Sequence, residues 1–135
     1  MYLDRNAITK IEGLIDNHHL KVLSLNSNKI EKIENIDHLY LEELYVADNK
    51  LTQICGLQHL PTLRTLDLSR NDITQLRGLE HVEALRFLNL SLNSVSKVYQ
   101  LQFVENLGML TELDMCFNPI QNRKYYRAQT LYHIP

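Results

Sequence analysis

Residues 66–76 read LDLSRNDITQL, with two leucines one residue apart, an asparagine three positions later and further aliphatic residues behind it. A polar amide inside a mostly apolar run needs a structural reason. The same setting recurs along the chain at steps of 22, 21, 22, 22 and 25 residues, at Asn6, Asn28, Asn49, Asn71, Asn93 and Asn118. Self-similarity at a period of about 20–29 residues indicates stacked structural repeats.

Aligning the chain on these asparagines gives the template L-x-x-L-x-L-x-x-N-x-(I/L/V)-x-x-(I/L/V)-x-x-(I/L)-x-x-(L/V), which residues 20–39, 41–60, 63–82 and 85–104 follow. One coil cannot bury its own apolar residues, but stacked coils share a continuous core. We expect a short strand at each L-x-L, with the strands forming a parallel sheet at a spacing of about 4.8 Å. The asparagines should form a ladder that satisfies buried backbone groups at the turns.

The template resembles the leucine-rich repeat in its short 22-residue variety, which carries I-x-x-I-E-G-L on the return path. Residues 8–14, ITKIEGL, match that segment, and the resemblance extends over nearly the whole chain. This variety is typified by the nuclear regulatory subunit of protein phosphatase 1 and also occurs in an outer-arm dynein light chain. The resemblance implies a right-handed α/β solenoid with a parallel concave sheet, a loosely helical convex side and a C-terminal helical cap.

The chain is expected to divide into about six repeats over residues 1–119, the first incomplete, and an apparently truncated cap over residues 120–135. Gln121 to Tyr132 is expected to be helical. Three extra residues in the fifth repeat predict one additional helical turn on the convex side. One template position is filled by Gly13, Gly56, Gly78, Asn35 and Gln100. Glycine and asparagine tolerate positive φ, which predicts a left-handed backbone at this position, and Gln100 is the one residue that does not suit it.

Net charge and cysteine content indicate which classes of partner and which cellular compartment suit the chain. With 135 residues, a net charge of −2 and a pI near 6.3, the chain favours neither nucleic acid nor anionic membrane as a partner. Cys55 and Cys116 are expected to be too far apart for a disulfide, which favours a reducing compartment: cytoplasmic, with nuclear or axonemal locations possible. No 18-residue apolar run is present.

We find no catalytic motif and therefore predict no enzyme activity and no cofactor. His38, His59 and His81 occupy one template position in three consecutive repeats, but three ligands in a line surround a tetrahedral metal ion poorly, so no metal site is predicted. Arg123, Lys124 and Arg127 alternate with tyrosines, as in some nucleic-acid sites, but their place on the expected cap helix favours a structural role.

The positions that the repeat does not dictate lie on the concave face, because the x residues of L-x-L point away from the core. Four such columns carry six acidic and two basic residues, a net charge of −4, and large apolar residues gather in the last two repeats. Exposed apolar clusters rimmed by polar groups mark interaction sites. The predicted partner-binding residues are Tyr45, Asp67, Phe87, Asn89, Leu92, Glu112, Asp114 and Phe117.

The sequence therefore predicts a monomeric, non-enzymatic module that binds a protein with a basic and partly apolar surface. The alternative is a structural spacer within a larger multidomain protein whose activity lies elsewhere.

Overall fold

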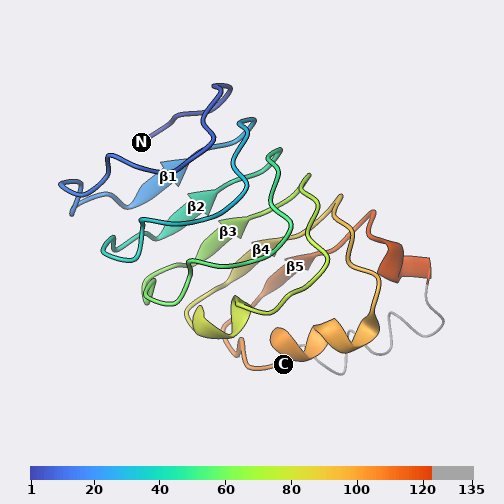
Figure 1. Ribbon diagram of the computed structural model, residues 1–135. Helices are drawn as coiled ribbons and strands as arrows, with labels where there is room; N and C mark the ends of the chain where they lie inside the picture. Colours follow the sequence, from blue (N-terminus) through green and yellow to red (C-terminus); the bar gives the residue numbers. More distant parts are fainter. Residues whose placement is uncertain (123–135) are drawn as a thin grey trace.

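The computed structural model describes residues 1–122 of the chain. Over this range the strands form one five-stranded parallel sheet in sequence order (Figure 1): β1 (Val22–Ser24), β2 (Glu43–Tyr45), β3 (Thr65–Asp67), β4 (Phe87–Asn89) and β5 (Glu112–Asp114). The central residue of every strand is the leucine of L-x-L, and these leucines lie in register from Leu23 to Leu113. The first template copy adds an isolated parallel bridge between Tyr2 and Ser24. The predicted stacked solenoid is confirmed.

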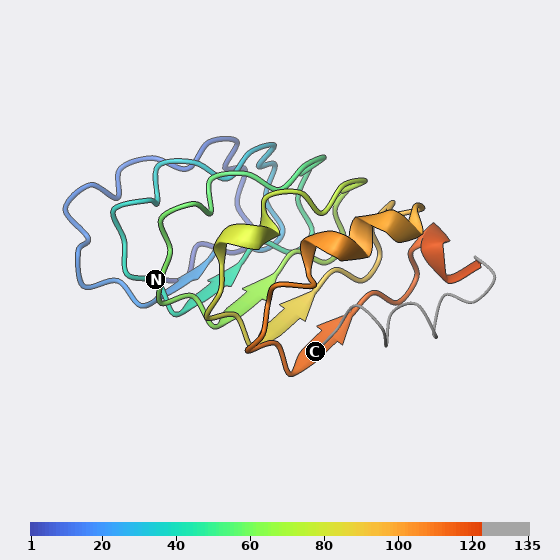
Figure 2. The same ribbon diagram turned by 90° about the horizontal axis from the view of Figure 1, so that it is seen from below.

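The return segments lie opposite the sheet and contain short 3-10 helices (Figure 2): η1 (Leu79–His81), η2 (Val98–Phe103) and η3 (Pro119–Asn122). The six-residue η2 falls in the fifth repeat, where three extra residues predicted an added turn. Leu101, Val104 and Leu107 from this segment are fully buried. The longer repeat therefore adds helix without losing its contribution to the core.

The core is a continuous column of template aliphatic side chains running from Ile11 to Ile120. Each coil contributes strand leucines on one side and return-segment isoleucines, valines and leucines on the other. Burying one such side chain contributes roughly 1.5–3 kcal/mol. Because each layer is completed by its neighbours, stability depends on stacking and not on any single coil.

The asparagine ladder joins each coil to the coil before it. Asn71 Nδ2 donates to the carbonyl oxygens of Leu68 at 3.1 Å, in its own coil, and of Val46 at 2.9 Å, in the preceding coil. Asn71 Oδ1 accepts the N–H of Leu51 at 2.9 Å. The same bridging pattern is formed by Asn28, Asn49, Asn93 and Asn118. Asn6 is the exception: it is exposed and bonds to carbonyl oxygens of its own turn.

The glycine position behaves as predicted, and the structure explains its misfit. Gly13, Gly56, Gly78 and Asn35 all have positive φ. At Gly78 a Cβ atom would lie 2.5 Å from a carbonyl oxygen of the preceding coil, so close coil-to-coil packing excludes a side chain. Gln100 instead lies inside η2, is 3% exposed, and its Oε1 accepts the N–H of the preceding coil's Leu76 at 2.8 Å.

Several predictions concern the chain termini and cysteines. Of the expected helix from Gln121 to Tyr132, the first two residues are described and belong to η3. The rest of that helix and the basic cluster lie outside the described residues, and the repeat boundary at residue 119 stays a prediction.

Cys55 and Cys116 are both free thiols. In residues 1–122 no helix is long and apolar enough to cross a membrane.

Candidate functional site

The candidate site is the face of the five-stranded sheet turned away from the core, here called the concave face. Parallel register aligns one residue from each coil into a central row: Tyr2, Ser24, Tyr45, Asp67, Asn89 and Asp114. A second row runs beside it: Val22, Glu43, Thr65, Phe87 and Glu112. Six of the eight predicted partner-binding residues belong to these two rows.

The polar residues of the central row also organise the turns that follow the strands. Asp67 Oδ1 accepts the backbone N–H of Ser69 at 2.9 Å. Asn89 and Asp114 accept the equivalent N–H two residues onward, at 3.0 and 2.8 Å. All three side chains are half-buried. One oxygen of each is therefore committed to the fold, and the rest of each side chain faces the concave surface.

The remaining predicted residues differ in exposure. Phe117 is 74% exposed and Leu92 is 40% exposed, and both follow a strand instead of lying within one. Glu112 is exposed, whereas Tyr45 and Phe87 are half-buried. Phe87 therefore contributes partly to packing, and the apolar contact area available to a partner comes mainly from Leu92 and Phe117.

A left-handed backbone column borders the concave face, and sequence reasoning did not anticipate it. In every repeat the residue before the ladder asparagine has φ between 55° and 59°: Arg5, Ser27, Asp48, Arg70, Leu92 and Phe117. Glycine or asparagine is the usual occupant of such a conformation, because a left-handed L-residue costs roughly 1–2 kcal/mol. No glycine or asparagine stands in this column, so its composition gave no signal.

Two hydrogen bonds shape the electrostatics of the face. Tyr45 Oη donates to Glu43 Oε2 at 2.7 Å, and this bond is the main reason that the pKa of Tyr45 rises to about 12. A hydrogen bond to the Asp114 carboxylate raises the pKa of the exposed Cys116 thiol, with the negative charge of Asp114 adding to the effect. The Tyr45 phenol and the Cys116 thiol are therefore neutral near pH 7.

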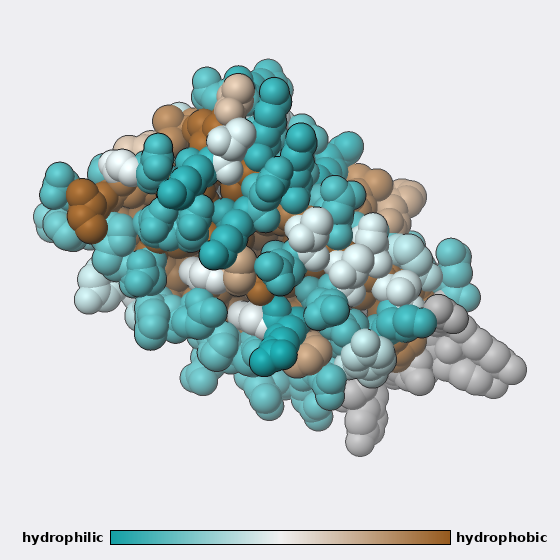
Figure 3. All heavy atoms as spheres, in the orientation of Figure 1, coloured by the Kyte–Doolittle hydropathy of each residue, from teal (hydrophilic) through white to brown (hydrophobic). Residues whose placement is uncertain are grey.

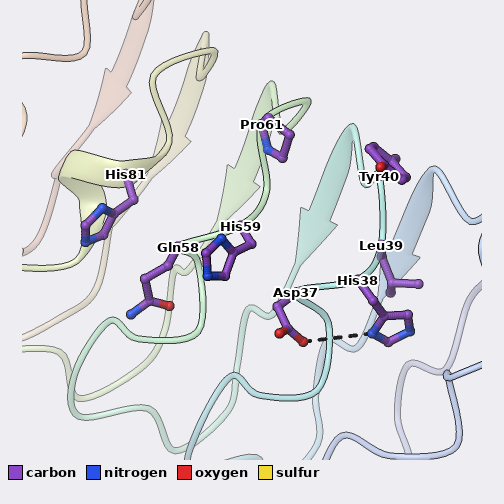
Figure 4. Close-up of a pocket in the computed structure, with 8 residues that line it drawn as sticks. All are labelled: Asp37, His38, Leu39, Tyr40, Gln58, His59, Pro61 and His81. Carbon is purple, nitrogen blue, oxygen red and sulfur yellow. Dashed lines mark ion pairs between the residues drawn. The ribbon is translucent and has the colours of Figure 1, made fainter.

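The histidine column lies away from the sheet, in a hollow of about 460 Å³ (Figure 4). Figure 4 draws the three imidazoles on separate coils. His38 is committed to local contacts: Nε2 lies 3.0 Å from the carbonyl oxygen of Leu14, and Nδ1 lies 3.9 Å from Asp37. Within residues 1–122 no three His, Cys, Asp or Glu side chains are arranged to hold a metal ion.

Apolar side chains are also exposed away from the concave face. Ile15, Tyr40, Tyr99 and Met109 are more than half exposed, but they are spread over three coils and lie in return segments or turns. In the view of Figure 3 the surface is mainly hydrophilic, with apolar residues visible in small separate areas. Leu92 and Phe117 differ from these residues because they occupy the same position in adjacent repeats.

Comparison with known proteins identifies the family. A family pattern described as a leucine-rich repeat matches residues 40–95, and a second of the same description matches residues 16–32. A chain of the solved Drosophila melanogaster SNF/U2A′ complex superposes with a TM-score of 0.76 at 30% identity, over 84% of this chain and 68% of that one. The chain is a leucine-rich repeat protein.

Two further relatives agree with this family. An internalin from Listeria monocytogenes superposes with a TM-score of 0.66 at 29% identity, over 75% of this chain and 29% of that one. A protein phosphatase 1 regulatory inhibitor subunit homologue from Arabidopsis thaliana is 34% identical over 61 residues, or 43% of this chain and 19% of the relative. This leucine-rich repeat chain thus spans about a fifth of the length of that curated relative.

Proposed function

We propose that this leucine-rich repeat chain is a non-enzymatic recognition module that binds a protein partner through its concave face. The sheet is held by backbone ladders and by the asparagine ladder, so the side chains on it are positioned before a partner arrives. Such preorganisation reduces the conformational entropy lost on binding. The partner we infer has a basic and partly apolar surface, and the chain binds it as a monomer.

The observation that carries this proposal is the pair Leu92 and Phe117. Phe117 is 74% exposed and gains little from burial in the free chain, and Leu92 leaves 40% of its surface exposed. Both have a left-handed backbone, which branched and aromatic residues adopt at a cost. Local conformation therefore disfavours these residues, burial in the free chain offsets that cost only in part, and contact with a partner supplies a reason for them.

Charge supports the same partner chemistry. The four columns of residues that flank the strand leucines on the concave face carry six acidic and two basic residues, a net charge of −4, against −2 for the whole chain. Complementary charge accelerates association and selects among partners. A basic surface with apolar anchors would therefore meet both features of the face.

The relatives support a protein partner in general terms. One is described as a regulatory inhibitor subunit of a phosphatase, and another was solved as part of a complex. The two free thiols fit a reducing compartment, and we propose the cytoplasm, nucleus or axoneme. The alternative is a structural spacer within a larger multidomain protein whose activity lies elsewhere.

Affinity capture from cell extract tests the proposal. The test variant is Leu92→Glu/Phe117→Glu, and the matched control is Tyr99→Glu/Met109→Glu, which makes the same charge change at exposed apolar residues outside the concave face. Circular dichroism verifies that both variants are folded. We expect a specific protein to be lost from the test variant and retained by the control. Identical protein sets for all three chains would favour the spacer.

A further inference from the structure

The half of the concave face opposite the apolar pair has a different chemistry. Tyr2 pairs with Ser24, and Ser24 pairs with Tyr45, so the two tyrosines flank a small residue from the strands on either side. Strands about 4.8 Å apart place the two tyrosine backbones about 10 Å apart, and side chains on the inner side of a curved sheet converge. Tyr2 is 75% exposed and Tyr45 is half-buried, so their rings are available at the surface.

Two carboxylates lie beside these tyrosines. Glu43 accepts the hydrogen bond of Tyr45, and Asp67 is the next residue in the central row after Tyr45. The pKa of Tyr45 is raised first by that hydrogen bond, then by partial burial, and further by electrostatic interaction with Glu43, Tyr2 and Asp67. Among the described residues, neither carboxylate forms an ion pair with a lysine or an arginine.

We propose that this area, formed by Tyr2, Glu43, Tyr45 and Asp67, binds an arginine side chain of the partner. The inference rests on the proposed function and specifies the partner's chemistry over β1 to β3. A guanidinium is planar, so it can stack on a phenol ring while its N–H groups donate to carboxylates. A lysine ammonium would meet the carboxylates but would gain less from the rings.

The arrangement also gives the partner a direction. The two apolar anchors follow β4 and β5, whereas the tyrosines and their carboxylates lie between the first bridge and β3. A bound partner would therefore place arginine over the N-terminal coils and apolar side chains over the C-terminal coils. This order distinguishes the proposal from general attraction between an acidic face and any cation.

The test measures binding of fluorescein-labelled nona-arginine and nona-lysine peptides to the full chain by fluorescence anisotropy. The test variant is Glu43→Gln/Asp67→Asn. It preserves the fold because glutamine still accepts the Tyr45 hydrogen bond, and Asn89 already makes the Asp67-type turn bond in the next strand. The charge-matched control is Glu31→Gln/Asp72→Asn, at exposed positions outside the concave face.

We expect the test variant to weaken nona-arginine binding at least fivefold and the control to change it less than twofold. Tyr2→Ala should reduce the preference for arginine over lysine without altering the fold, because Tyr2 is largely exposed. Equal weakening by the two double variants, or equal affinity of the wild-type chain for both peptides, would overturn the proposal, as would no detectable binding.

The two proposals fail separately. If cell-extract capture is lost with Leu92→Glu/Phe117→Glu but unchanged with Glu43→Gln/Asp67→Asn, the arginine site is wrong and the concave-face proposal stands. If neither variant changes capture while the peptide preference holds, the area binds arginine peptides, but the proposed partner face is wrong and the partner's arginine falls with it.

Discussion

Replacing Asn71 by alanine tests the physical basis of the fold, and the chain provides its own control. Asn71 occupies an interior position of the ladder, is 6% exposed and bridges two coils. Asn6 occupies the same template position but is exposed and bonds within its own turn. The same substitution at the two sites therefore removes the same atoms from two different environments.

The expected cost follows from the hydrogen bonds. Without the Asn71 amide, the Leu51 N–H loses its partner inside the core, which costs about 1–3 kcal/mol. The carbonyl oxygens of Val46 and Leu68 each keep a second hydrogen bond, from Asn49 and Asn93 respectively. Losing the two hydrogen bonds that Asn71 donates to these oxygens therefore adds only about 1 kcal/mol in total. The Asn71→Ala variant should lose roughly 2–4 kcal/mol of unfolding free energy, whereas Asn6→Ala should lose less than about 1 kcal/mol.

Urea unfolding followed by far-ultraviolet circular dichroism measures both values. Domains of this size have stabilities of about 5–15 kcal/mol, so the Asn71 effect is a large shift in midpoint. Similar midpoints for the two variants would refute the claim that bridging between coils, and not the asparagine itself, supplies the stability.

Three other predictions follow from single contacts. Gly78→Ala should lower the free energy of unfolding by about 2 kcal/mol or more, because the new Cβ atom would lie 2.5 Å from a carbonyl oxygen. Gly13→Ala has open space around its Cβ atom and should lower it by about 1 kcal/mol, from backbone strain alone. Urea midpoints of the two variants compare these costs. Gln100→Leu should cost about 1–3 kcal/mol in the same assay, because the buried N–H of Leu76 loses its acceptor. In an ultraviolet titration Tyr45 should ionise near pH 12, and Glu43→Ala, which removes the acceptor, should lower that pKa toward 10. Because the folded-state pKa is raised, the associated stability is present below pH 10 and lost between pH 10 and 12. An unchanged Tyr45 titration in that variant would contradict the assigned hydrogen bond.

The fold was predictable because the template encodes it repeatedly. The spacing of Asn71 and its equivalents predicted both the ladder and the parallel sheet, and the structure confirms both. The extra residues of the fifth repeat predicted an added turn, which is η2. These features depend on periodic apolar residues and on one polar residue type, both of which can be read directly from sequence.

The site was less predictable because its positions lack a fixed residue type. The left-handed column holds arginine, serine, aspartate, leucine and phenylalanine, so composition did not reveal the conformation that the turn imposes. The alternation of L-x-L placed Asp67 and Asn89 on the sheet face but could not show that each holds the following turn. Half-burial of Phe87 likewise depends on its neighbours across the sheet.

Photo-crosslinking tests the central claim, binding at the concave face, most directly. Benzoylphenylalanine would replace Phe117 in one chain and Tyr99 in another, since these aromatic residues are 74% and 61% exposed and lie on the concave rim and on a return segment. After irradiation in cell extract, we predict a specific protein adduct from position 117 and none from position 99. An adduct from position 99 alone would contradict binding at the concave face.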